Sequence, residues 1–129
     1  MPQKEKYQLE FVINTSTKVL YNMLSTPSGL SEWFADDVNL REDIFTFIWD
    51  GAEEQARKLS AKSGESIKFQ WIEDEEEGIK SYFELKIVVD DITKDVALIV
   101  TDFAEEDEIE EAKLLWENQV AELMHVLGC

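Results

Sequence analysis

The chain has very little of the residue types that crosslink or interrupt a fold. Its 129 residues include one cysteine, two prolines and five glycines. The single cysteine, Cys129, has no partner within the chain, so an intramolecular disulfide is excluded, which agrees with a reducing, cytoplasmic location. The scarcity of proline and glycine leaves no segment with the composition of a disordered linker. We therefore expect one domain spanning residues 1–129, located in the cytoplasm.

Basic residues are scarce too. Only 12 Lys and Arg stand against 29 Asp and Glu, which gives a formal net charge of -17. Nucleic acids and anionic membrane surfaces attract clusters of Lys and Arg and repel a protein of this charge, so neither is expected as a partner. Many acidic residues gather in 73–77 and 105–111. These runs are either solvated turn and helix-start charge or a docking surface for a basic protein partner.

Long hydrophobic runs are missing as well. Nowhere does the chain contain the ~18 consecutive apolar residues that a membrane-spanning helix needs. The first six residues, MPQKEK, are not followed by the apolar segment of a secretion signal. We expect a protein that neither spans a membrane nor is secreted by a visible signal.

The first 34 residues predict one strand followed by two short helices. Apolar and polar residues alternate from Tyr7 to Ile13, as in a strand that buries one face. Helical spacing follows from Ser16 and ends at Thr26-Pro27, because proline disfavours helix at the residue before it. A second short helix starts there, and its apolar face consists of Leu30, Trp33 and Phe34.

The middle of the chain predicts a series of strands. Alternation marks residues 44–49, 67–71 and 83–89, and residues 96–103 form a last strand that is apolar on both faces. Residues 52–63 fit either a short helix or an exposed hairpin strand, and their position between two glycine turns favours the strand. The acidic residues 73–77 are expected in a turn that closes at Gly78, and Asp36-Asp37 in helix termination and a solvated loop.

A long amphipathic helix is predicted over residues 109–127, where apolar residues recur at spacings of three and four. Asp107 and Glu110 have the spacing of a capping box, and Gly128 is placed as the C-terminal stop. An antiparallel sheet with one apolar face must be covered, and only this helix is long enough to do so. The predicted fold is α+β: a curved antiparallel sheet of about six to seven strands around the C-terminal helix, with two short helices between the first two strands.

Aromatic side chains dominate the positions expected between sheet and helix. Each of them is explained by a plain hydrophobic core, and the alternative is a cavity that binds a small ligand. The tryptophans favour the second interpretation, because an indole is costly to bury whole and often lines a pocket with its N–H available. The candidate cavity residues are Trp33, Phe34, Phe45, Phe47, Trp49, Phe69, Trp71, Phe83, Trp116 and Val120.

The sequence contains no recognisable catalytic or metal-binding pattern. His125 is the only histidine and lies near the end of the last helix, where it suits a surface role. The acidic run 73–77 lacks the spaced ligands of a calcium loop, and the glycines are too far apart for a phosphate-binding loop. We expect no metal, no cofactor and no catalytic residue. An enzyme would need an acidic or imidazole group pointing into the cavity.

Several segments resemble the START-like helix-grip superfamily, known for polyketide cyclases and birch-pollen-allergen-like lipid carriers. They are NTSTKVLY at 14–21, LSEWFADD at 30–37, FTFIW at 45–49, and Trp116 with Leu123 in the last helix. Within the superfamily the chain looks most like the Aha-type branch, homologues of the activator of the heat-shock ATPase. Branch members often carry a Gly-Trp pair early in the last helix, where this chain has Leu115-Trp116.

The resemblance leaves two main functions open. In the first, the protein is a non-catalytic binder of a small hydrophobic or aromatic ligand. In the second, it is a co-chaperone-like interaction module whose cavity is filled by its own side chains, and it docks a protein partner or forms a homodimer. A cyclase-type enzyme is a third possibility. A connected pocket of roughly 300 Å³ or more would favour the ligand, whereas a packed interior would favour the interaction module.

Overall fold

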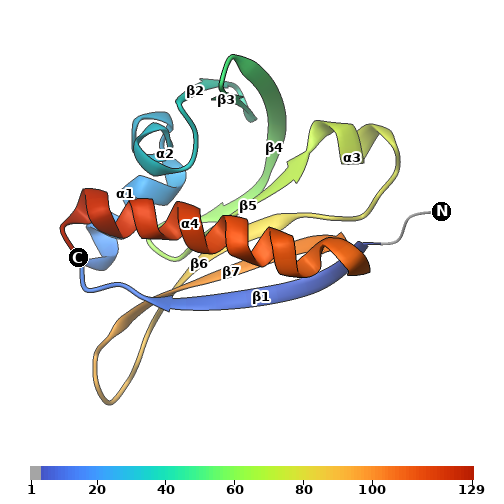
Figure 1. Ribbon diagram of the computed structural model, residues 1–129. Helices are drawn as coiled ribbons and strands as arrows, with labels where there is room; N and C mark the ends of the chain where they lie inside the picture. Colours follow the sequence, from blue (N-terminus) through green and yellow to red (C-terminus); the bar gives the residue numbers. More distant parts are fainter. Residues whose placement is uncertain (1–3) are drawn as a thin grey trace.

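The computed structural model describes residues 4–129, and its centre is one seven-stranded antiparallel sheet (Figure 1). The strands lie in the order β1-β7-β6-β5-β4-β3-β2, so the first strand of the chain pairs with the last. Their bounds are β1 Lys4–Val12, β2 Asp37–Arg41, β3 Ile44–Trp49, β4 Ala52–Lys62, β5 Ser66–Trp71, β6 Phe83–Val89 and β7 Val96–Glu105.

The helices cover the concave face of this sheet. Figure 1 shows the long α4, Ile109–Leu127, lying across the face. The short helices α1, Thr17–Ser25, and α2, Pro27–Trp33, lie near the C-terminal end of α4. A 3-10 turn at Glu106–Glu108 leads into α4, and α3, Ile72–Glu76, follows β5. The helix-grip fold expected from the sequence is confirmed, with two short helices between β1 and β2.

The corner between α1 and α2 is built by Thr26. Its hydroxyl donates to the carbonyl of Asn22 in the last turn of α1 and accepts the N–H of Gly29 in the first turn of α2, at 2.8 and 2.9 Å. Pro27 occupies the first position of α2, where a missing N–H costs nothing. Gly29 is buried, and a Cβ there would lie only 2.3 Å from the carbonyl oxygen of Asn22. Because Gly29 has no side chain, the two helices can pack closely. This packing places Trp33 and Phe34, at the end of α2, in the centre of the molecule.

The space between sheet and α4 is largely filled by side chains. Phe45, Phe47, Phe69 and Phe83 extend from three strands and are almost completely buried. Phe69 and Phe83 stack with ring centroids 4.9 Å apart. The helix contributes its own buried residues to the same core, namely Trp116, Val120 and Leu123. Burial of these large rings supplies much of the hydrophobic stabilisation.

The ambiguous segment and the end of the last helix agree with the sequence analysis. Residues 52–63 are almost entirely β4, which confirms the favoured strand. Gly128 adopts a left-handed conformation with φ of 77° and ends α4, as expected. The predicted start of α4 at residue 109 is confirmed, but the predicted capping box is wrong: Asp107 lies in the preceding 3-10 turn, and the N-cap position is held by Glu108 without a side-chain hydrogen bond.

Two acidic segments also differ from expectation. Asp37 begins β2 rather than a loop, because residues 37–41 pair with β3 along the edge of the sheet. Residues 72–76 form α3 rather than a plain turn, and Asp74 within it is buried. The carboxylate of Asp74 accepts hydrogen bonds from the Lys4 ammonium at 2.8 Å and from the Ser81 hydroxyl. The contact with Lys4 ties α3 to the beginning of β1.

Candidate functional site

An open pocket of about 400 Å³ lies at the mouth of the space between the sheet, α2 and α4. Its walls come from β3, β4, β5 and β7, from the end of α2, and from one side of α4. The lining residues are Phe34, Trp49, Glu54, Trp71, Asp102, Leu115, Trp116 and Gln119. A neighbouring surface groove of about 600 Å³ shares Phe34, Trp49, Leu115 and Gln119 with it, and Trp33 lines that groove.

The aromatic walls are set by strand ends and by the end of α2. Trp49 is the last residue of β3 and Trp71 the last of β5, and their ring centroids are 6.2 Å apart. Phe34 follows α2 directly and lies between α4 and the sheet, 5.3 Å from Trp49 and 5.6 Å from Trp116. Segments far apart in the sequence thus bring four aromatic side chains to one place.

Three of the four indole N–H groups are engaged within the protein. Trp33 donates to the carbonyl of Met23 at 2.8 Å, and Trp49 donates to the carbonyl of Phe34 at 2.7 Å. Trp116 donates to the carboxylate of Asp102 at 2.8 Å. The expectation that tryptophan N–H groups face a ligand is therefore wrong for these three. Their hydrogen bonds instead fix the orientation of the rings.

The sequence analysis missed four lining residues, namely Asp102, Glu54, Leu115 and Gln119, and Asp102 has the most contacts with its surroundings. It lies on β7 directly opposite Tyr7 on β1, and the Tyr7 hydroxyl donates to the same oxygen, Oδ2, as the Trp116 indole, at 3.3 Å. The other oxygen, Oδ1, accepts the N–H of Phe103 at 2.7 Å. Asp102 therefore brings a half-buried carboxyl group to the wall of an aromatic pocket.

Burial and hydrogen bonding act in opposite directions on the pKa of Asp102. Desolvation raises the pKa of Asp102, while the hydrogen bonds from Trp116, Phe103 and Tyr7 and the positive charge of Lys4 offset part of that rise. The pKa of Tyr7 is raised strongly, first by burial and then by the negative charge of Asp102. The phenol therefore stays protonated and acts as a donor.

Glu54 supplies a second carboxylate. It pairs with Phe47 in the β3–β4 register, so its side chain lies on the same face of the sheet as the aromatic core, but it is exposed at the mouth of the pocket. Opposite it, the Gln119 amide on α4 donates to the carbonyl of Phe34 at 3.1 Å. None of the described residues that line this pocket is Lys, Arg or His.

The predicted cavity residues divide into two groups. Phe34, Trp49, Trp71 and Trp116 line the pocket, and Trp33 lines the adjoining groove. The others are buried in the core behind it and form its packed floor: Phe45, Phe47, Phe69, Phe83 and Val120. The sequence could have signalled Asp102, because it continues the period of two set by Leu98 and Val100 on β7.

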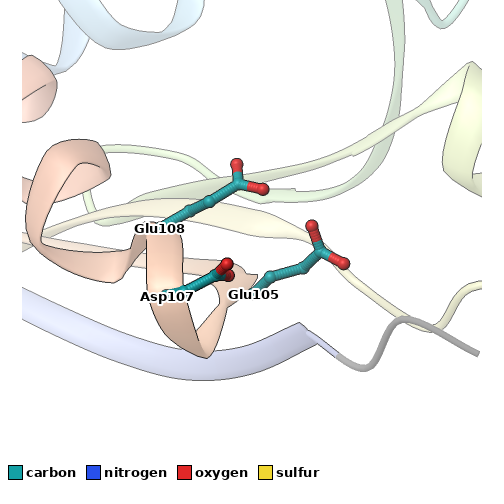
Figure 2. Close-up of side chains that lie close together, drawn as sticks. All are labelled: Glu105, Asp107 and Glu108. Carbon is teal, nitrogen blue, oxygen red and sulfur yellow. The ribbon is translucent and has the colours of Figure 1, made fainter.

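A separate acidic cluster lies where β7 passes into α4 (Figure 2). Carboxylate oxygens of Glu105, Asp107 and Glu108 are within 4.8 Å of one another. The pKa of Glu108 is raised, chiefly by a hydrogen bond to the Glu105 carboxyl and by the charge of that group. Carboxylates this close can bind a cation or share a proton. On a strongly acidic surface, however, carboxylates also lie close together without a cation or a shared proton. The cluster alone therefore identifies no metal site.

The comparison with known families follows from this architecture. A family model described as the START-like superfamily domain matches residues 1–129. The chain belongs to the START-like superfamily. The resemblance expected from the sequence is confirmed over its whole length. Among proteins of curated function no match was found.

Solved structures give the same result for this START-like domain. It shares 38% identity with BfR322 from Bacteroides fragilis, with 97% of this chain and 92% of that chain covered and a TM-score of 0.67. The Aha1 dimer from Colwellia psychrerythraea has a TM-score of 0.77 at 14% identity, with 93% of each chain covered. CalU16 from Micromonospora echinospora has a TM-score of 0.72 at 14% identity, with 96% of this chain and 74% of that chain covered. The last two likenesses establish the fold alone.

No helix within residues 4–129 is both long enough and apolar enough to cross a lipid bilayer.

Proposed function

We propose that this START-like domain is a non-catalytic binder of a small hydrophobic or aromatic molecule, held in the pocket between the sheet, α2 and α4. The observation that carries the proposal is a volume of about 400 Å³ walled by Phe34, Trp49, Trp71 and Trp116. Volumes of about 300–1,000 Å³ with mostly apolar walls and a few polar groups are typical of ligand sites.

The rigidity of the walls supports binding. The indoles of Trp49 and Trp116 are held by hydrogen bonds of 2.7 and 2.8 Å, and Phe34 is packed between them. A ligand that stacks on these rings loses little free energy to ordering them, because their rotamers are already fixed. The pocket is thus prepared for a flat or aromatic molecule.

The surroundings of Asp102 favour binding over catalysis. It is the acidic group that a cyclase-type enzyme would need inside the pocket. Its oxygens, however, already accept hydrogen bonds from Trp116, Tyr7 and the Phe103 N–H. A general acid or base must exchange its proton with a substrate at hydrogen-bond distance, and this group is engaged by structural donors instead.

An interaction module is the second candidate. Leu114 and Leu115 on α4 are 57% and 60% exposed, and such neighbouring apolar side chains are suited to a protein contact. One of the structures with the same fold is described as a dimer. A second copy of this chain or another protein docking on α4 would give these side chains a role.

Two measurements separate the candidates. Native mass spectrometry of the protein purified from its own host reports a retained small molecule and the number of subunits together. Titration with 2-naphthol, followed by nuclear magnetic resonance of the indole N–H signals, tests the pocket directly. Saturable shifts at Trp49 and Trp116 are expected, reduced in Trp71→Leu and unchanged in Ile92→Ala, whose side chain is 91% exposed on a distant loop.

The opposite result is equally clear. A dimer without any retained molecule, together with no saturable shift from 2-naphthol, would replace the ligand binder with the interaction module. Thermal unfolding of Trp71→Leu and Ile92→Ala shows whether both variants remain folded during the titrations.

A further inference from the structure

The charge of the pocket walls is strongly one-sided. Glu54 and Asp102 line the aromatic pocket. The adjoining groove adds further carboxylates from α2, the segment after it and α4, namely Glu32, Asp36 and Glu122. Across both linings, the residues that the structure describes include no Lys, Arg or His. A negatively charged ligand would be repelled at this site, and a neutral one would leave the carboxylates without a counter-charge.

The aromatic walls of the pocket, like its carboxylates, favour a positively charged ligand. Trp49, Trp71 and Trp116 line the pocket, and indole is the aromatic ring that attracts cations most strongly. The hydrogen bonds of Trp49 and Trp116 hold these rings in place. Indole faces combined with carboxylates provide both of the interactions that stabilise an ammonium group outside water.

We propose that the pocket binds an organic cation, an amine whose apolar part stacks on Phe34 and the indoles while its ammonium group lies near Glu54 and Asp102. This inference rests on the proposed function and names the chemical class of its ligand. Glu54 at the mouth provides an exposed charge that attracts the amine, and Asp102 provides a half-buried one at the wall.

Asp102 gains from such a ligand. Its carboxyl is disfavoured as an anion by burial, and the nearest cation acting on it is Lys4. Lys4 itself is bound to Asp74 at 2.8 Å. An ammonium group entering from the pocket would supply the counter-charge that the surrounding donors, Tyr7 and Trp116, cannot provide, because both are neutral.

A matched series of probes tests this inference. Isothermal titration calorimetry measures the affinities of 2-naphthylmethylamine, 2-naphthylmethanol and 2-naphthoate, which share one ring system and differ in charge. At physiological salt we expect the amine to bind about tenfold more tightly than the alcohol, and the carboxylate to bind most weakly. Glu54→Gln and Asp102→Asn should each reduce the ratio of the affinity for the amine to the affinity for the alcohol.

Glu117→Gln is the matched control, because it removes the same charge from an exposed position on α4 next to Trp116. The preference for the amine should persist in this variant. If Glu117→Gln reduces the preference as much as Glu54→Gln does, the attraction comes from the overall negative charge and the inference is overturned. Equal affinity for amine and alcohol would overturn the inference and leave the proposed function standing, whereas no binding of any probe would overturn both. Thermal unfolding verifies that every variant is folded.

Discussion

The corner between α1 and α2 gives a sharp prediction, because helix propensity and packing disagree there about Gly29→Ala. Alanine in a helix is favoured over glycine by about 1 kcal/mol, so propensity alone predicts stabilisation. In this structure the new Cβ would lie 2.3 Å from the Asn22 carbonyl oxygen, 2.7 Å from the Met23 Cα and 2.9 Å from the Thr26 hydroxyl oxygen. Two of these neighbours are backbone atoms that cannot rotate away.

The packing penalty outweighs the gain. Relief of the closest contact requires α1 and α2 to separate by roughly 1 Å, since ordinary contacts begin near 3.4 Å. Overpacking of this kind costs up to about 3 kcal/mol, so the net destabilisation should be about 2 kcal/mol. For a chain of this length that corresponds to a fall in Tm of roughly 6–10 °C. The same displacement would move Phe34 and weaken the pocket.

Urea unfolding followed by circular dichroism measures the effect, with thermal unfolding as a second readout. Ser28→Ala is the control, because Ser28 is exposed in the same helix and its replacement should change the free energy of unfolding by less than about 0.5 kcal/mol. A Gly29→Ala protein as stable as the original, or more stable, would show that the corner relaxes freely and would refute the packing argument.

The remaining predictions concern two buried carboxyl groups. The raised pKa of Asp102 means that the folded protein holds its proton more tightly than the unfolded chain does, so its stabilising effect is complete below the ordinary pKa of 3.8 and is lost as pH rises through the raised value. The free energy of unfolding of the original protein relative to Asp102→Asn should therefore fall as pH rises above the ordinary pKa of 3.8, and a flat difference would contradict the assignment. Asp74→Ala leaves the Lys4 ammonium and the buried Ser81 hydroxyl without their acceptor and should cost about 1–3 kcal/mol in urea unfolding, whereas Glu73→Ala, at an exposed neighbour, should cost almost nothing.

Much of the fold could be predicted because its strands bury one face and its last helix buries one stripe. The alternation through Phe45, Phe47 and Trp49 follows directly from a sheet with an apolar concave side. The strand β2 was not identified individually, because Val38 is its only buried residue. β2 is held in the sheet by its pairing with β3, and the local pattern of apolar and polar residues does not predict such pairing.

The site was predicted only in part, for a related reason. The aromatic residues are numerous enough to mark the interior, but the polar groups of the pocket depend on register. Asp102 lies opposite Tyr7, which is 95 residues earlier in the chain, and accepts a hydrogen bond from its hydroxyl. Asp74 is buried within α3 and binds Lys4, which is 70 residues earlier in the chain. The alternation along β7 places Asp102 on the same face as Leu98 and Val100, but the distant partners of Asp102 and Asp74 cannot be read from the local sequence.

The pairing of β1 with β7 has a consequence for how the chain acquires its structure. Residues 4–12 of β1 pair with residues 97–105 of β7, which are about 90 residues later in the sequence. β1 therefore cannot pair until β7 has been synthesised. Joining such distant segments carries a large loop-closure entropy, and domains rich in these contacts fold in milliseconds to seconds rather than microseconds. On the ribosome, β1 would emerge before the other six strands of the sheet and could pair with β7 only after all of them have been synthesised.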